Sequence, residues 1–85
     1  MSAPGLVSRD AVVEVLRTIA PEVEAAALDN LLALRHQVDL DSMDWLNFLI
    51  GLQQRFGVEV PESDYARLVS LDDLLNYLHD RASQH

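Results

Sequence analysis

The fold is decided by residues 41–56, which read DSMDWLNFLIGLQQRF. A helix advances about 100° per residue, and at that spacing one arc roughly 100° wide gathers the large apolar side chains of Trp45, Phe48, Leu49, Leu52 and Phe56. The pattern predicts a helix over residues 42–56 with this arc buried. A second apolar stripe lies on a separate arc and either packs under a loop or meets a partner protein. It consists of Met43, Leu46 and Ile50.

Ser42 begins this helix, between Asp41 and Asp44. A hydroxyl at a helix start is exposed to the positive end of the helix dipole, so backbone N–H groups would stabilise a phosphate ester on it. The position therefore predicts a modification site. A nucleophilic serine would need a histidine base and the Gly-x-Ser-x-Gly elbow. The elbow is missing here, and His36 is expected to be a solvated loop histidine.

A first helix is predicted before this segment, with Ser8 as its N-cap and Pro21 as its stop. Residues 21–40 contain good helix formers, but their leucines cover too much of the helix circumference for one buried face. A second full helix is one alternative for this segment. We expect instead a long packed loop, with one or two short helical turns and its leucines anchored in the core. These leucines are Leu28, Leu31, Leu32 and Leu34.

Further signals follow the decisive helix. Gly57 suits its C-terminal cap, and residues 58–61 read as an extended connector. Pro61 is expected to open a short helix. Ser70 and Asp73 form a capping box at the start of the last helix. The buried face of that helix is expected to consist of Leu71, Leu74, Leu75 and Leu78. The expected fold is all-α, with three main helices, one short helix and a long loop between the first two main helices. We expect a domain at residues 8–80, a flexible N-terminus at 1–7 and a frayed tail at 81–85.

The composition favours a binding or carrier domain over an enzyme. The chain has 85 residues, so it can bury only one small core with little room for a deep active site. Its net charge of −8 repels nucleic acid and anionic lipid and favours basic protein surfaces. It has no cysteine and no apolar run long enough to span a bilayer, which favours a cytoplasmic protein.

A metal site is not expected in the aspartate-rich segment. An EF-hand loop starting at Asp39 would need an oxygen ligand at Met43, glycine at Asp44 and glutamate at Ile50. His79 and His85 have no partner at ligand spacing and are expected to face solvent.

Three pieces of sequence, in this order and spacing, resemble the acyl carrier protein family. They are residues 40–43 (LDSM), 56–61 (FGVEVP) and 74–78 (LLNYL), within a similarity that runs from about residue 8 to residue 80. The resemblance implies phosphopantetheine esterified to Ser42, with Asp41 helping a phosphopantetheinyl transferase hold magnesium and coenzyme A. It also implies a monomer without catalytic activity of its own. Such a carrier holds an acyl or aminoacyl group as a thioester and presents it to loading, elongating and acyl-transferring enzymes of lipid, fatty acid or polyketide biosynthesis.

The resemblance also implies two surfaces around Ser42. Partner enzymes would dock on the helix that follows it, at Met43, Asp44, Leu46, Asn47, Ile50 and Gln54. The acyl pocket would be lined by Trp45, Leu49, Tyr65 and Leu68. Trp45 and Tyr65 stand where the family commonly has smaller residues; they are either ordinary core aromatics or narrow the pocket toward short or polar cargo.

Other departures concern the charges that partners meet. The family's housekeeping members usually have glycine shortly before the Asp-Ser pair and several glutamates along the following helix. This chain has residues 38–40 (VDL) before the pair, and Asn47, Gln53 and Gln54 along the helix. Fewer charges weaken attraction to basic enzymes and favour a dedicated pathway. The alternative function is an acidic helical adaptor that binds a protein partner without a prosthetic group, in which Ser42 would be only an N-cap.

Overall fold

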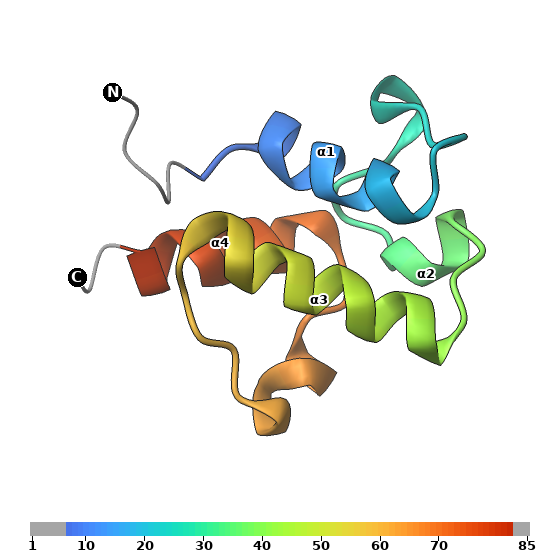
Figure 1. Ribbon diagram of the computed structural model, residues 1–85. Coiled ribbons are helices and arrows are strands. Elements are labelled where there is room, and N and C mark those ends of the chain that lie inside the picture. The colour runs from blue at the N-terminus through green and yellow to red at the C-terminus, as the bar shows by residue number, and fades with distance from the viewer. Residues whose placement is uncertain (1–6, 83–85) are drawn as a thin grey trace.

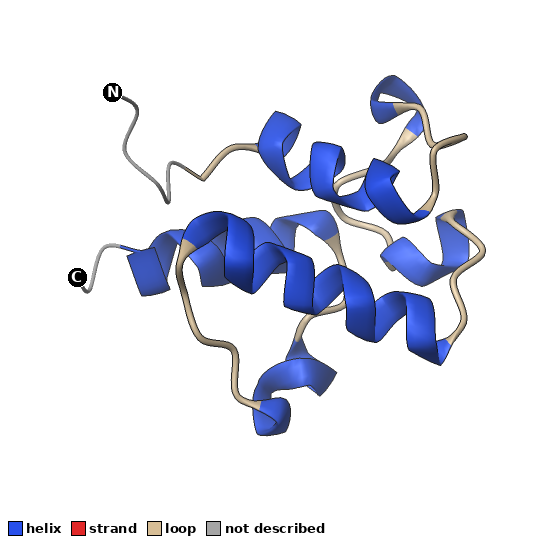
Figure 2. Cartoon of the chain, viewed as in Figure 1, coloured by secondary structure: helices blue, strands red, loops and turns tan. Residues whose placement is uncertain are grey.

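The computed structural model describes residues 7–82. Its three main helices are α1 (Arg9–Ile19), α3 (Ser42–Phe56) and α4 (Leu71–Ala82), and α1 packs against both α3 and α4 (Figure 1). Three short helical segments lie in the connections: η1 (Ala25–Ala27), α2 (Leu34–Gln37) and η2 (Glu62–Arg67). Residues 7–82 contain no β-strand (Figure 2), so the all-α prediction is confirmed.

The core forms where the apolar faces of the three main helices meet. The predicted arc of α3 is confirmed, since Phe48, Leu49, Leu52 and Phe56 are buried and Trp45 is half-buried. The other two helices supply a second set of fully buried side chains: Val12, Leu16, Leu71, Leu74 and Leu78. At the contact between α1 and α3, a Cβ atom on Gly51 would lie only 2.9 Å from Cγ1 of Val15, so a glycine allows this close approach.

The helix ends follow the predicted capping residues. The Ser8 hydroxyl accepts a hydrogen bond from the Ala11 N–H at 3.2 Å. In the capping box of α4, the Ser70 hydroxyl accepts from the Asp73 N–H, and the Asp73 carboxylate accepts from the Ser70 N–H, both at 3.1 Å. Gly57 ends α3 in the left-handed conformation, with φ of 64°. These local signals therefore determined the helix boundaries correctly.

The long connection between α1 and α3 holds two short helical turns, η1 and α2, as predicted. Leu34 is completely buried and Leu28 packs against the core. The prediction was wrong for Leu31 and Leu32, which are 76% and 57% exposed. Hydrogen bonds from Arg9 and Gln37 hold this segment against the rest of the protein, so the segment stays packed without burying these two leucines.

The main polar clamp on this connection is Arg9, at the start of α1. Its guanidinium donates to the side chain of Asn30 at 2.7 Å and to the carbonyls of Ala25 and Leu28 at 2.8 and 2.9 Å. The side chain of Gln37 adds three more hydrogen bonds to residues of the same connection. Since burying a carbonyl without a partner is costly, these side chains allow a long loop to pack closely.

The ordered core extends past the expected domain limits of residues 8 and 80. Val7 is buried in the core, although residues 1–7 were expected to be flexible, and α4 continues through Arg81 to Ala82. Arg81 bonds to Tyr77 within α4 and to Asp64 of η2. Residues 1–6 and 83–85, the rest of the two expected terminal segments, lie outside the described residues.

The left-handed backbone at Gly57 predicts that Gly57→Ala lowers the free energy of unfolding by about 1 kcal/mol, because a Cβ atom disfavours positive φ. No atom lies within 4 Å of that Cβ position, so conformation rather than crowding causes the loss. Urea denaturation measures the change, and Gly57→Asn, which tolerates this conformation better, is the control. Equal stability of the alanine variant and the parent protein would contradict the assignment.

Candidate functional site

Ser42 is the first residue of α3, and its side chain is exposed. Asp41 caps the helix: its carboxylate accepts from the Asp44 N–H at 2.8 Å, and its carbonyl accepts from the Trp45 N–H at 2.9 Å. The N–H groups of Ser42 and Met43 have no acceptor within the helix because they belong to its first turn. The Ser42 hydroxyl makes no hydrogen bond with any residue of the described part.

This geometry fits a phosphate ester on Ser42. The hydroxyl is accessible and unengaged, and the free N–H groups and the helix dipole favour an anion at this end of α3. The side chains of Asp39 and Asp41, which precede Ser42 in the chain, are exposed. The residues present therefore fit the attachment of a phosphate-linked group.

The second apolar stripe of α3 is exposed on the surface next to Ser42. Met43, Leu46 and Ile50 are 66%, 37% and 39% exposed, so the stripe does not pack under the long connection. The other residues expected at a docking surface are also on this helix: Asn47 and Gln54 are exposed and Asp44 is half-buried. Gln53 instead holds the connector after α3, because its side chain accepts from the Val60 N–H at 3.2 Å.

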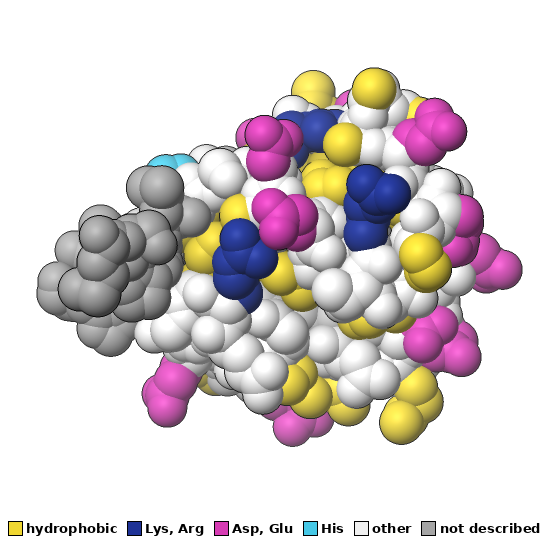
Figure 3. Space-filling view, turned by 45° about the horizontal axis from the view of Figure 1, so that its top comes forward, with side chains coloured by type: hydrophobic (Ala, Val, Ile, Leu, Met, Phe, Trp, Pro, Cys, Tyr) yellow, Lys and Arg dark blue, Asp and Glu magenta, His cyan; other side chains and the backbone are white. Residues whose placement is uncertain are grey.

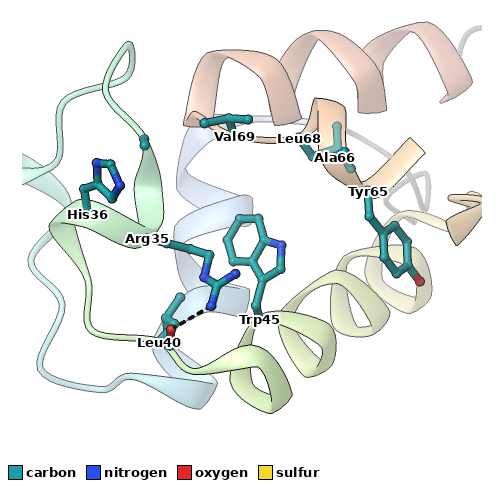
Figure 4. Close-up of a pocket in the computed structure, with 9 residues that line it drawn as sticks. Arg35, His36, Leu40, Trp45, Tyr65, Ala66, Leu68 and Val69 are labelled. Atoms are coloured by element: carbon teal, nitrogen blue, oxygen red, sulfur yellow. Dashed lines mark hydrogen bonds between the residues drawn. The ribbon is translucent and has the colours of Figure 1, made fainter. Parts of the chain in front are cut away.

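A cleft of about 490 Å³ opens beside the first turn of α3 (Figure 4). It is lined by Ala33, Arg35, His36, Leu40, Trp45, Tyr65, Ala66, Leu68 and Val69. The structure thus brings together three of the four residues expected at an acyl pocket: Trp45, Tyr65 and Leu68. The fourth, Leu49, is 1% exposed and lies in the core instead, because it shares the buried arc of α3 with Phe48 and Leu52.

Arg35 is the cleft residue that the sequence analysis missed. Its guanidinium carbon lies 5.8 Å from the centre of the Trp45 ring, and one of its N–H groups donates to the carbonyl of Leu40 at 3.3 Å (Figure 4). The Trp45 indole also contacts Phe48, with ring centres 5.5 Å apart. A single arginine in the four-residue helix α2 has no spacing signal, so only the folded chain reveals its place.

The wall of the cleft formed by η2 is tied to α4 through Asp64. The Tyr77 hydroxyl donates to the Asp64 carboxylate at 2.6 Å, and Arg81 and Arg67 lie 3.4 and 3.8 Å from it. The Tyr77 hydrogen bond and the two arginine charges lower the pKa of Asp64, although partial burial opposes them. Burial, together with the Asp64 bond, raises the pKa of Tyr77. This network positions η2 against the bundle.

Because the pKa of Asp64 is lower in the folded protein than its ordinary value of 3.8, the Asp64 charge stabilises the fold above that pH. This stabilisation disappears as the pH falls through the folded-state pKa. We predict that Asp64→Asn unfolds at a lower temperature than the parent protein at pH 7 and that the difference shrinks below pH 3.8.

Thermal unfolding by circular dichroism between neutral and acid pH measures this difference. Asp39→Asn, which removes an exposed carboxylate without an ion pair among residues 7–82, is the matched control. A difference between Asp64→Asn and the parent that stays constant over the whole pH range would contradict the role of the charge.

Within the described part of the chain, no three acidic or histidine side chains form a group that could hold a metal ion. No helix between residues 7 and 82 is long and apolar enough to cross a membrane. Acidic side chains occur over several elements of the face in Figure 3, with fewer basic ones among them. His79 is exposed on α4, and His85 lies outside the described residues.

Comparison with known proteins identifies a family for most of the chain. The family model for a phosphopantetheine attachment site matches residues 9–78. The acyl carrier protein of Campylobacter hominis is 32% identical over 72 residues, which cover 85% of each chain. The acyl carrier protein of Campylobacter concisus is 35% identical over 72 residues, covering 82% of this chain and 84% of its own. The acyl carrier protein of Campylobacter fetus is 33% identical over 73 residues, with the same coverage.

Proposed function

Because this chain belongs to the acyl carrier protein family, we propose that Ser42 is the residue that carries its phosphopantetheine. The chain is a phosphopantetheine-bearing acyl carrier, in which the terminal thiol of that group holds an acyl cargo as a thioester. The choice of Ser42 is supported by its exposed hydroxyl, which makes no hydrogen bond with the described residues and lies in the first turn of α3. Ser42 also lies within residues 9–78, which the family model matches. Free N–H groups there favour the phosphate ester.

Asp41 has two roles in this proposal. One oxygen of its carboxylate caps Asp44, which fixes the backbone on which Ser42 stands. Its exposed carboxylate also contributes ligands to the magnesium ion that a phosphopantetheinyl transferase brings with coenzyme A, since hard cations prefer carboxylate oxygens.

The chain itself performs no catalytic step in this proposal. Acyl carriers present cargo to enzymes, and here no histidine of the described part bonds to the Ser42 hydroxyl to make it a nucleophile. The enzymes that load, extend or transfer the cargo supply the chemistry. We propose a cytoplasmic location, which suits a chain without cysteine.

Intact-mass measurement tests the attachment residue. After incubation with coenzyme A and a broad phosphopantetheinyl transferase, the protein should gain the mass of one phosphopantetheinyl group, and Ser42→Ala should gain none. Ser8→Ala, which removes the serine hydroxyl that caps α1, should still gain it. An adduct that persists in Ser42→Ala would move the site elsewhere, and no adduct on the parent protein would favour the adaptor function.

Partner enzymes dock, we propose, on the exposed stripe of Met43, Leu46 and Ile50. These side chains follow Ser42 along one face of α3, so an enzyme that contacts them also reaches the modified serine. The stripe is small, which suits brief encounters with successive enzymes. The chain's net charge of −8 attracts basic partners and makes the encounter sensitive to salt.

The double substitution Leu46→Gln and Ile50→Gln should lower kcat/KM for phosphopantetheinyl transfer by roughly fivefold, because about 1 kcal/mol of apolar contact is lost. Its unfolding temperature should change little, since both side chains are exposed. The matched control is Leu31→Gln with Leu32→Gln, which changes two exposed leucines outside α3. An equal loss in both double variants would show that the α3 stripe has no special role.

A further inference from the structure

The cleft beside Ser42 has a charge opposite to that of the protein as a whole. The chain carries 14 acidic and 6 basic residues, yet the cleft lining includes Arg35 and His36 and no acidic residue. A second cleft, of about 450 Å³, is formed within the long connection and has the reverse character. Its lining includes Glu22, Glu24 and Asp39. The positive character is therefore specific to the cleft that Trp45 and Tyr65 line.

The guanidinium of Arg35 is available to a ligand. Within residues 7–82 no carboxylate lies within 4.0 Å of it, whereas Arg55, Arg67 and Arg81 all have acidic partners. Its hydrogen bond to the Leu40 carbonyl uses one of five N–H donors. The Trp45 ring beside it limits where the guanidinium can lie, which favours a defined geometry over a freely moving charge.

The cleft is also within reach of Ser42. Leu40 stands two residues before Ser42, and Trp45 is three residues after it, about one helical turn away. A cargo tethered to Ser42 is held at high effective concentration beside this cleft. The apolar parts of Leu40, Trp45, Tyr65 and Leu68 suit a short methylene chain, and an arginine pairs with a carboxylate through two parallel hydrogen bonds.

We propose that the cleft accepts a short acyl cargo that ends in a carboxylate, the monothioester of a dicarboxylic acid, and that Arg35 is the residue that selects it. The proposal rests on the attachment of phosphopantetheine to Ser42. Trp45 and Tyr65 line the same cleft as Arg35, so in this proposal they contact the methylene groups of the cargo while Arg35 binds its carboxylate.

The test compares two cargoes that differ mainly in their last group. Succinyl and butyryl groups are loaded onto the protein as hydrolysis-resistant analogues of their pantetheine thioesters, and intact mass confirms one adduct on each sample. The succinyl form should unfold about 2 to 5 °C above the butyryl form, the size expected for one partly exposed ion pair in a domain of this length. Trp45 is the single tryptophan of the chain, so its emission reports on the cleft and should differ between the two forms.

The variants assign the effect to Arg35. The difference between the two cargoes should vanish in Arg35→Gln, shrink in Arg35→Lys and persist in Arg17→Gln, which removes an exposed arginine of α1 outside the cleft lining. Two outcomes would overturn the inference. The first is that the succinyl and butyryl forms of the parent protein unfold at the same temperature. The second is that Arg35→Gln destabilises the protein carrying phosphopantetheine without cargo as much as it destabilises the succinyl form. The second outcome would mean that Arg35 pairs with the phosphate on Ser42 and not with the carboxylate of the cargo. Absence of any mass adduct would instead count against the proposed function.

Discussion

The structure depends on the burial of one arc of α3. Phe48, Leu49, Leu52 and Phe56 share one buried core with the apolar faces of α1 and α4, and burial of such apolar surface is the main driving force for folding a chain of this size. A helix of 15 residues that buries one arc leaves its other side and its first turn free. Ser42 and the exposed stripe are consequences of that division.

Hydrogen bonds then place the long connection so that a cleft forms beside this first turn. The Leu34 N–H donates to the carbonyl of Val69 at 2.8 Å, which joins the connection to the segment before α4. Arg9 holds the same connection from α1. Leu34 and Leu40 complete the attachment by burial. The walls of the cleft thus come from three parts of the chain: the long connection, α3, and η2 with the residues that follow it. The hydrogen bonds and ion pairs of Asp64 hold η2 in place.

A carrier must meet several enzymes without remaining on any of them, and the surface of this chain suits that requirement. Its exposed apolar stripe is narrow, and the chain as a whole has a net charge of −8. Long-range attraction to basic partners speeds the encounter, while the small contact area permits rapid release. The cleft is different because Arg35 places a cation where the cargo lies in our proposal.

Local patterns in the sequence determined much of this protein: the all-α fold, the caps at Ser8, Gly57 and Ser70, the buried arc of α3 and the exposed position of Ser42. Each depends on residues within a few positions of one another, so spacing alone reveals it. The tertiary structure decided what depends on contacts between distant residues. In the structure Leu31 and Leu32 are exposed, and Leu49 lies in the core and not in the expected pocket. Arg35 lies beside Trp45. The tertiary structure also joined Asp64 to Tyr77 and Arg81. These contacts form only when packing brings separate segments together, and no local preference encodes them.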